Sequence, residues 1–513
     1  MSISWTEVPW LTILVGIPAL AALLMACIPG LRRAGKWMAL GTSLVELALA
    51  IVVACFFDWG STGSFQLAQT FEWIPQLGVS WALSVNALGL VMILLAAVLV
   101  PIVVFATPSV KEDSREGSYY AWMMLLFAFI VLIFSSFDVV LFYLAFEGML
   151  IPLYFMIAGY GPGENARGAA MKLLIYSLLG GLVMLGGLVT IFSMGMGADI
   201  PALFRYDTLT SLLPNIPLGY QMAIFVTFFV AFAIKAPMVP VHTWLPDAAE
   251  QARPGTSVLL VGVLDKIGTF GMIVLCLNFT PNAASEVRWT ILILAVVSIL
   301  WGGFAANGQK NLMRLVSFTS VSHFGFMVLG IFVGSDIALT GAMFYMVAHG
   351  LSIAGLFLIS GFLVERGRKD NISDYRGWQR VTPVLAGTWL FAGLASIALP
   401  GLSGFVPEYL VLMGTWKVSM PLAIIAVLGV VLAAMYILMP YQRMFTGPKP
   451  DITVPDLNGR EKVAISPLIV GMLILGIWSA PLVGALQGVS ETTHLVGAEV
   501  ENSTPAGEEE GGN

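Results

Sequence analysis

Apolar stretches long enough to cross a lipid bilayer fill most of this sequence. A bilayer-spanning helix needs about 20 predominantly apolar residues. Only 11% of the 513 residues are charged, against about a quarter in soluble proteins. The chain is therefore predicted to be an all-α integral membrane protein, which excludes an ordinary soluble protein and a nucleic-acid-binding protein. Fourteen transmembrane helices are predicted, at approximately 9–28, 36–57, 84–106, 119–136, 139–160, 168–193, 219–240, 255–278, 288–305, 313–333, 337–363, 383–415, 419–441 and 464–488.

Positively charged residues gather at alternate ends of these spans. Cytoplasmic loops of membrane proteins keep an excess of Lys and Arg. Nineteen of the 24 positively charged residues follow odd-numbered spans, and three, Arg205, Arg288 and Lys417, follow even-numbered spans. We therefore expect both termini on the non-cytoplasmic side. The last fifteen residues contain five Glu and no Lys or Arg, which predicts a short flexible acidic tail.

The three cysteines, Cys27, Cys55 and Cys276, lie far apart, each in an apolar run. An iron–sulfur cluster needs about four neighbouring thiolates, and a zinc site needs comparable clustering. We therefore expect this chain to hold no metal and no cofactor of its own.

Several ionisable residues lie inside predicted spans, where a central charge costs about 2.5 to 3.5 kcal/mol on insertion scales. Two of these intramembrane residues, the acid Glu147 and the base Lys235, could form a pair. If about 4 Å apart, they would attract by roughly 4 kcal/mol at an effective dielectric near 20, enough to control whether Lys235 holds a proton. For these two alone, a static buried ion pair is the alternative. The whole set is Glu46, Glu147, Lys235, Asp265, Lys266, His323, His349 and Glu408.

Acids, lysines and histidines at membrane depth are typical of a proton relay. His323 and His349 are the two histidines predicted at mid-helix, and imidazole titrates near pH 6.5. Each is either a relay group or a hydrogen-bonded structural residue. A haem-ligating pair is a third alternative, although cytochrome b-type proteins usually have two such pairs. Glu46 and Asp265 are weaker candidates, because a Ser, a backbone group or a neighbouring lysine could satisfy each.

Two predicted spans contain helix-breaking residues. Pro237 and Pro240 follow Lys235, so the carbonyls of Ala233 and Ala236 are expected to lose their helical donors. A second run, SIALPGLSGFVPEYLVL, has the same character and leads to Glu408. Paired interrupted helices are the best sequence sign of a transporter site between inverted repeats. Two ordinary proline kinks are the alternative.

Four longer segments resemble the antiporter-like membrane subunits of respiratory complex I, the proton-translocating NADH:quinone oxidoreductase, and among them the M-type. They are LAFEGMLIPLYFMI around Glu147, AFAIKAPMVPVHTWLPDAAEQARPG at 231–255, LMRLVSFTSVSHFGFMVLG at 312–330 and MFYMVAHGLSIAGLFLISGFL at 343–363. The resemblance covers nearly the whole chain. It implies two inverted five-helix repeats, helices 4–8 and 9–13, with helices 7 and 12 broken.

The resemblance also implies roles for residues that match the motifs of the family. Glu147 resembles the helix-5 glutamate that modulates Lys235 on broken helix 7. Lys266 resembles the central helix-8 lysine of the proton path. His323 and His349 match the polar links between the half-channels.

Two further features bear on the subfamily. Glu408 matches the acidic residue of helix 12, where L- and N-type relatives place a lysine. Little sequence follows helix 14, so the long lateral helix of an L-type subunit is not expected. Asp265, beside Lys266, is not part of the family pattern. Because neighbours in a helix point about 100° apart, it either lowers the proton affinity of Lys266, by less than a facing acid would raise it, or faces another helix.

These inferences define five expected segments. They are a three-helix scaffold at 1–110, the first repeat at 111–280, the second at 281–445, a loop and helix 14 at 446–490, and the tail at 491–513.

The expected function is proton translocation through buried Glu, Lys and His residues, coupled to NADH:quinone electron transfer in other subunits. The chain is thus expected to be part of an enzyme, a translocase, without redox chemistry of its own. FMN, iron–sulfur clusters and quinone are expected in partner subunits, and the expected partners are L- and N-type neighbours, lipids and protons. The expected location is the inner membrane of a bacterium. The alternatives are a subunit of a multi-subunit sodium/proton antiporter and a non-pumping membrane scaffold.

Overall fold

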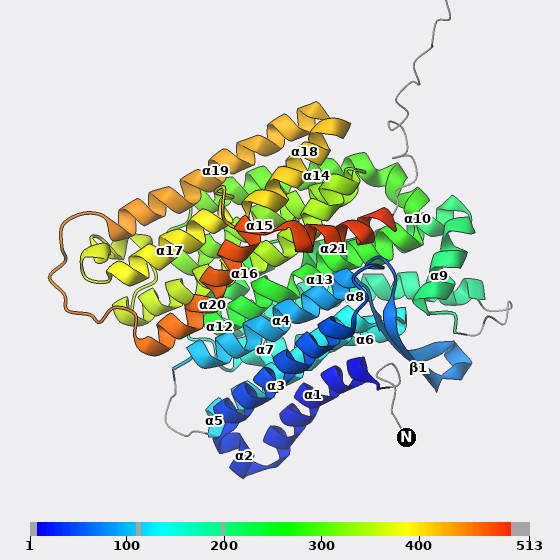
Figure 1. Cartoon of the computed structure of the whole chain (residues 1–513), viewed down its shortest axis with the longest axis horizontal. Coiled ribbons are helices and arrows are strands. Elements are labelled where there is room, and N and C mark those ends of the chain that lie inside the picture. Colours follow the sequence, from blue (N-terminus) through cyan, green and yellow to red (C-terminus); the bar gives the residue numbers. More distant parts are fainter. Residues whose placement is uncertain (1–7, 109–113, 196–199, 201, 494–513) are drawn as a thin grey trace, which may run out of the picture.

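The computed structural model describes residues 8–108, 114–195, 200 and 202–493, so residues 494–513 of the predicted tail lie outside it. Its helices lie largely side by side, many along the long dimension of the molecule (Figure 1). The predicted class, a mainly helical multi-pass membrane protein, is confirmed. Within the described residues, twelve helices are long and apolar enough to cross a membrane, or thirteen if one bent pair counts as a span. The predicted number of fourteen is not confirmed.

The N-terminal part consists of three long helices and a hairpin. Its elements are α1 (Trp10–Cys27), α2 (Pro29–Arg33), α3 (Gly35–Phe56), β1 (Gln66–Ile74), a 3-10 turn (Pro75–Leu77), β2 (Val79–Val85) and α4 (Ala87–Ala106).

The middle part, residues 114–277, contains the first broken span, which is interrupted between α10 and α11. Its elements are α5 (Ser114–Ser135), α6 (Val139–Gly148), α7 (Leu150–Ala158), α8 (Ala166–Gly195), α9 (Tyr206–Leu212), a 3-10 turn (Leu213–Asn215), α10 (Leu218–Lys235), α11 (Trp244–Gln251), α12 (Pro254–Leu259), a π-helical turn (Leu260–Leu264), α13 (Lys266–Gly271) and a second π-helical segment (Met272–Leu277).

The C-terminal part contains the second break and the bent pair α20 and α21, which meet at 71°. Its elements are α14 (Pro281–Asn307), α15 (Leu312–Phe332), α16 (Asp336–Gly367), 3-10 turns at Ile372–Asp374 and Trp378–Arg380, α17 (Pro383–Ser396), α18 (Phe405–Val418), α19 (Met420–Phe445), α20 (Gly459–Ile477) and α21 (Ala480–Glu491).

The predicted span 383–415 consists of two short helices. α17 and α18 have 14 residues each, so neither reaches the length of a full crossing. Between them Gly401 has a φ of +89°, a left-handed conformation that glycine adopts without the steric cost of a Cβ. This break therefore explains why the predicted span 383–415 is not among the helices long enough to cross a membrane.

The hairpin of β1 and β2 is absent from the sequence-based prediction. β1 pairs antiparallel with β2, and Gly78 closes the turn with a φ of +68°. The span predicted to begin at 84 begins instead at Ala87, because Asn86 caps α4 by accepting a hydrogen bond from the Gly89 N–H at 3.0 Å. The hairpin thus belongs to the loop between α3 and α4.

Burial divides the helices into a centre and a rim. Almost every residue of the segment Pro254–Leu277 and of helix α15 is buried, and so are most residues of α16. The rim helices expose large apolar side chains, for example Leu179 and Leu182 on α8 and Ile293 on α14. Because a helix that is apolar all round is normally buried in protein or lipid, the exposed rim is the surface expected to face a bilayer.

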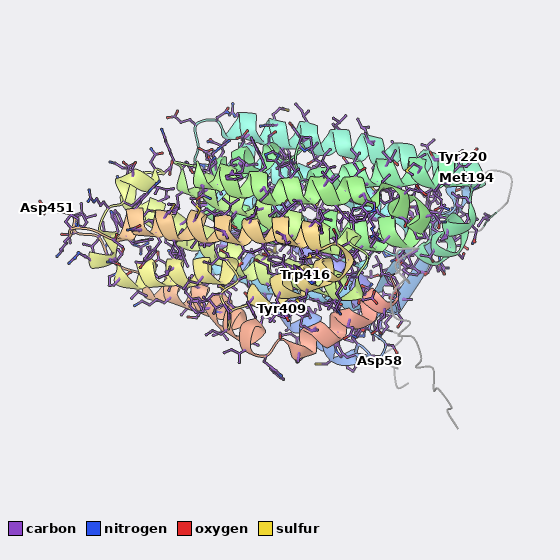
Figure 2. All side chains as sticks on the ribbon, turned by 90° about the horizontal axis from the view of Figure 1, so that it is seen from above. Asp58, Met194, Tyr220, Tyr409, Trp416 and Asp451 are labelled. Atoms are coloured by element: carbon purple, nitrogen blue, oxygen red, sulfur yellow. The ribbon has the colours of Figure 1, made fainter. Side chains whose placement is uncertain are left out.

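The two ends of the bundle differ in charge. The N-terminal start of α1 and the end of α21 lie at the end that carries the hairpin (Figure 1). Helix α2 and the loop between α19 and α20 lie at the opposite end (Figure 1). The last turn of α2 carries Arg32 and Arg33, and the loop carries Lys449. Asp58 and Asp451 lie toward opposite ends of the long dimension (Figure 2). The charge asymmetry that the sequence predicts is therefore an asymmetry between the two ends of one bundle.

Candidate functional site

Glu147 lies at the end of α6, where the span bends into α7. Asp138 fixes the start of α6 by accepting hydrogen bonds from the N–H groups of Val140 and Leu141, at 2.9 and 3.1 Å. The Glu147 carboxylate packs directly on Gly181 of α8, in space that a Cβ at that position would occupy. Its Oε1 atom is buried and has no hydrogen-bond partner. The carboxyl group therefore owes its position to close helix packing.

Lys235 is the last residue of α10 and is 3% exposed. The helix stops here as predicted from the two prolines, but the freed carbonyls find donors. The Trp244 indole N–H donates to the Ile234 carbonyl at 2.9 Å, and the Met238 N–H donates to the Ala233 carbonyl at 3.0 Å. The Ala233 carbonyl thus loses the helical donor at position 237, as expected, and accepts from the N–H five residues later instead.

The surroundings of Lys235 are aromatic and acidic. Its Nζ atom lies 5.3 Å from the centre of the Phe146 ring. The acids whose charges act on it are Glu147 and Asp265. Among the ion pairs of 4.0 Å or less in the described residues, none joins Lys235 to Glu147. The two groups are electrostatic neighbours and not a contact pair.

Lys266 and His349 are in direct contact at the centre of the bundle. The Lys266 Nζ atom lies 2.8 Å from Nδ1 of His349 and donates to the Val261 carbonyl at 2.5 Å. Nε2 of His349 lies 3.2 Å from the Ser320 hydroxyl oxygen. Lys266 is 0% exposed and His349 is 1% exposed. The structure thus brings together a lysine and a histidine that are 83 residues apart in the sequence.

The polar groups continue from His349 through His323. The two imidazole rings have centres 5.2 Å apart and meet edge to face. Nε2 of His323 lies 3.0 Å from the hydroxyl oxygen of Tyr436 on α19. Each histidine thus contacts another group that can donate or accept a proton.

Glu408 joins the same region through a tyrosine. It lies in the first turn of α18, directly after the second break, and is 4% exposed. The Tyr345 hydroxyl donates to its Oε2 atom at 2.8 Å. The rings of Tyr345 and His323 have centres 5.8 Å apart. Lys266, His349, His323 and Glu408 therefore belong to one buried set, hereafter the central chain, which also includes Tyr345 and Tyr436.

The two tyrosines are functional candidates that the sequence-based prediction missed. Tyr345 precedes His349 by four residues, so both lie on one face of α16, a spacing that could have identified it. Tyr436 lies in the apolar stretch of α19, and the nearest charged residue along the helix, Arg443, is seven residues later. Its only sign was that a buried tyrosine hydroxyl usually needs a partner.

An ion network holds the segment after the first break. Asp247 of α11 accepts from Lys172 of α8 at 2.6 Å and from Arg314 of α15 at 2.5 Å. Burial raises the pKa of the Asp247 carboxyl, but the two cations outweigh burial and leave this pKa below its usual value. Lys172 also donates to the Thr243 carbonyl at 2.9 Å. The network thus ties the break to two neighbouring helices.

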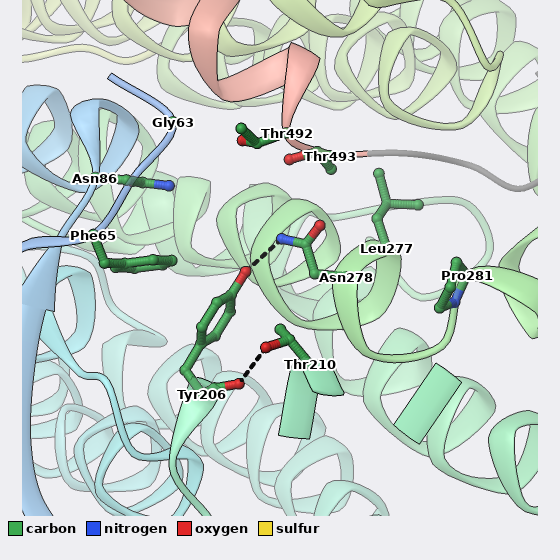
Figure 3. Close-up of a pocket in the computed structure, with 10 residues that line it drawn as sticks. All are labelled: Gly63, Phe65, Asn86, Tyr206, Thr210, Leu277, Asn278, Pro281, Thr492 and Thr493. Atoms are coloured by element: carbon green, nitrogen blue, oxygen red, sulfur yellow. Dashed lines mark hydrogen bonds between the residues drawn. The ribbon is translucent and has the colours of Figure 1, made fainter. Parts of the chain in front are cut away.

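A separate cavity of about 390 Å³ lies near the hairpin (Figure 3). Figure 3 shows the Tyr206 hydroxyl beside Asn278, whose amide donates to it at 2.7 Å. None of the six predicted site residues lines this cavity. Among the described residues, no group of three or more His, Cys, Asp or Glu could hold a metal ion.

Together, the broken spans and the central chain define a class, the antiporter-like multi-pass membrane proteins. Residues 136–433 match the family model described as NADH:quinone oxidoreductase/Mrp antiporter, TM. The relative named NADH-quinone oxidoreductase subunit M from Mycobacterium tuberculosis is 37% identical, over 95% of this chain and 94% of its own length. The relative of the same name from Rhodobacter capsulatus is 34% identical, over 95% of this chain and 96% of its own length. The chain belongs to the NADH:quinone oxidoreductase/Mrp antiporter family.

Solved structures agree with this assignment. A chain of respiratory complex I from Thermus thermophilus with bound NADH superposes with a TM-score of 0.85 at 27% identity, covering 94% of this chain and 98% of that chain. A chain of the Mrp complex from Dietzia sp. DQ12-45-1b has a TM-score of 0.84 at 20% identity, with coverages of 94% and 97%. The second match shows a common fold alone. Both matched chains are parts of multi-subunit membrane complexes.

Proposed function

We propose that this protein is the M-type, proton-translocating membrane subunit of an NADH:quinone oxidoreductase. The names of its relatives and the complex I match support the assignment to such an oxidoreductase complex. The observation that carries the proton-translocating role is the central chain. It joins Lys266 to His349 and Tyr345 to Glu408 by direct contacts, and all four side chains are buried. Ionisable groups kept at such depth usually mark a proton or ion pathway.

The chemistry of the pathway follows from its groups. A lysine, a histidine and a carboxylate each exist in two protonation states, and a tyrosine hydroxyl can accept one proton while it donates another. A change in the charge of Glu147 alters the electrostatic support for a proton on Lys235. When that support weakens, the proton leaves Lys235 for Lys266 and then passes through His349 and His323 toward Glu408.

The energy and the electrons come from elsewhere in the assembly. The neighbouring subunits are of the L and N types, with lipids filling the remaining rim. Partner subunits hold FMN, iron–sulfur clusters and quinone, and this chain performs no redox step. Its place is the inner membrane of a bacterium, with both termini on the non-cytoplasmic side. The repeats at 111–280 and 281–445 present the two breaks to the central chain.

One alternative is a subunit of a multi-subunit sodium/proton antiporter. The matched family model favours it, because its description names the Mrp antiporter beside NADH:quinone oxidoreductase. An antiporter of this kind uses one gradient to drive another and needs no NADH. The acid at position 408 favours the M-type subunit, because it stands where the L- and N-type relatives are expected to have a lysine.

The variants Lys235→Ala and Glu147→Ala test the function in the complete complex. Inverted membrane vesicles are given NADH, and proton uptake and NADH oxidation are measured together, with assembly checked on native gels. We expect each variant to assemble and to pump fewer protons per NADH. Full pumping in either variant would remove that residue from the mechanism. Sodium-driven proton movement without NADH oxidation would favour the antiporter, and unchanged pumping in both variants would favour a non-pumping scaffold.

A further inference from the structure

Asp265 is a fully buried carboxyl group without a bonding partner. It is 0% exposed, and neither of its carboxylate oxygens has a hydrogen-bond partner. Burial of an acid without compensation is costly, and each such group in a folded protein needs an explanation. The central chain as described above does not include it, and it is not part of the family pattern.

The packing of the following turn shows which way Asp265 faces. Gly268, three residues later, lies against the end of α10, where a Cβ would be 2.5 Å from the Ala236 nitrogen and 2.6 Å from the Phe232 carbonyl oxygen. Residues three apart share one face of a helix. Asp265 is therefore on the side of this helix that faces α10, next to the end that carries Lys235.

Lys266 faces a different neighbour. Consecutive residues point about 100° apart in a helix, and the Nζ atom of Lys266 contacts His349 on α16. The π-helical turn directly before these residues contributes to this arrangement, because the Asp265 N–H donates to the Leu260 carbonyl, five residues back, at 3.0 Å. Such turns occur often at functional sites. Two adjacent side chains thus serve two different helices.

The electrostatic surroundings agree with this geometry. The charges that act on Asp265 are those of Lys266 and Lys235. In turn, Asp265 acts on both lysines. Among the hydrogen bonds and ion pairs of the described residues, none joins Lys235 to Lys266, and none joins Asp265 to either lysine, so each transfer needs a side-chain movement that brings donor and acceptor together. Asp265 is the acid that both lysines share.

We propose that Asp265 carries the proton from Lys235 to Lys266. In the first step an N–H bond of the Lys235 ammonium group breaks and an O–H bond forms on the Asp265 carboxylate. In the second step that O–H bond breaks and an N–H bond forms on the neutral amine of Lys266. No electron moves and no co-reactant is needed. The inference rests on the proposed function and adds a proton-carrying residue to it.

The test compares Asp265→Asn with Asp265→Glu in the complete complex. Asparagine has nearly the same shape but cannot hold the proton, whereas glutamate can. We expect Asp265→Asn to pump at least five-fold fewer protons per NADH and Asp265→Glu to restore at least half of the pumping. Wild-type pumping in Asp265→Asn, together with a loss in Lys235→Ala, would overturn this inference alone. Unchanged pumping in both would overturn the proposed function as well.

Glu46 of α3 provides the matched control. It is likewise 0% exposed with both carboxylate oxygens unpartnered, but it lies outside the central chain. Glu46→Gln should pump like the wild type. If Glu46→Gln loses as much pumping as Asp265→Asn, the loss comes from removing any buried carboxylate and the proposal for Asp265 is overturned. If Asp265→Asn does not assemble, infrared difference spectra of the wild-type complex with isotope-labelled aspartate decide. A protonated aspartate band that appears during NADH oxidation supports the proposal, and its absence overturns it.

Discussion

At the scale of single residues, the link between His323 and Glu408 depends on a phenol. The Tyr345 hydroxyl donates to Glu408, and the Tyr345 ring lies beside His323. The carboxylate of Glu408 is almost completely buried, so this hydrogen bond is a large part of what stabilises its charged form. Tyr345 therefore influences both where the proton goes and how strongly Glu408 holds it.

The substitution Tyr345→Phe removes only this hydroxyl group. Losing a hydrogen bond to a charged group costs about 1.5 to 3 kcal/mol, so we expect proton transfer through this link to be roughly ten- to hundred-fold slower. Proton uptake per NADH in inverted vesicles measures it. Tyr119→Phe is the control, because that hydroxyl has a buried hydrogen bond of 2.9 Å to Thr256 outside the central chain. Equal pumping in the two variants would contradict a role for Tyr345.

The sequence identified charged members of the central chain and missed its neutral members. Lys266 and His349 are conspicuous because charge at membrane depth is costly. Tyr436 is not conspicuous in the sequence. A neutral tyrosine does not carry the energetic cost of a charge in the membrane when its hydroxyl group has a hydrogen-bond partner. The order of contacts was equally hidden, because the bond between Lys266 and His349 depends on the packing of α13 beside α15 and α16.

At the scale of elements, two adjacent glycines of α8, Gly180 and Gly181, form a seat for Glu147 and for α10, the helix that carries Lys235. The α10 backbone packs on Gly180, where a Cβ would lie 3.3 Å from the Ala231 Cα atom. The Glu147 carboxylate packs on Gly181. The small size of these residues lets three helices approach closely. The distance between Glu147 and Lys235 is thus set by α8.

The substitution Gly181→Ala tests this seat. The added methyl group would overlap the Glu147 carboxylate and force it away, so we expect a loss of pumping several-fold in size with NADH oxidation largely retained. Gly186→Ala on the same helix is the control, since nothing lies within 4 Å of its added Cβ. Both changes raise helix propensity equally. A similar loss in both variants would point to α8 as a whole and not to the seat.

The breaks of the helices were predictable, whereas the hairpin was not. Proline removes a helical donor wherever it stands, so the ends of α10 at Lys235 and α17 at Ser396 follow from local sequence. The hairpin lies between two strongly apolar spans, and its strands are only nine and seven residues long. Its pairing joins residues across a turn, which a search for apolar spans does not detect.

At the scale of the whole molecule, burial and charge describe how the bundle sits in a membrane. The segments that carry Lys266, His323 and His349 are the most buried, and the rim is apolar. The division of positive charge between the two ends was evident in the sequence, because it depends on loop composition and not on packing. The way in which α4, α15, α16 and the segment Pro254–Leu277 surround the central chain required the structure.

The orientation of the bundle can be measured with single cysteines at its two ends. In a background in which Cys27 and Cys55 are replaced by Ser, the exposed loop residues are changed singly, as Asp58→Cys and Asp451→Cys. A membrane-impermeant maleimide is then added to right-side-out and to inverted vesicles. Because the end with Asp451 carries the excess of Lys and Arg, we expect it to be labelled from the cytoplasmic side and Asp58→Cys from the other side. The reverse pattern would invert the proposed orientation and with it the direction of the proton path. Labelling of both from one side would mean that the bundle does not cross the membrane between these loops.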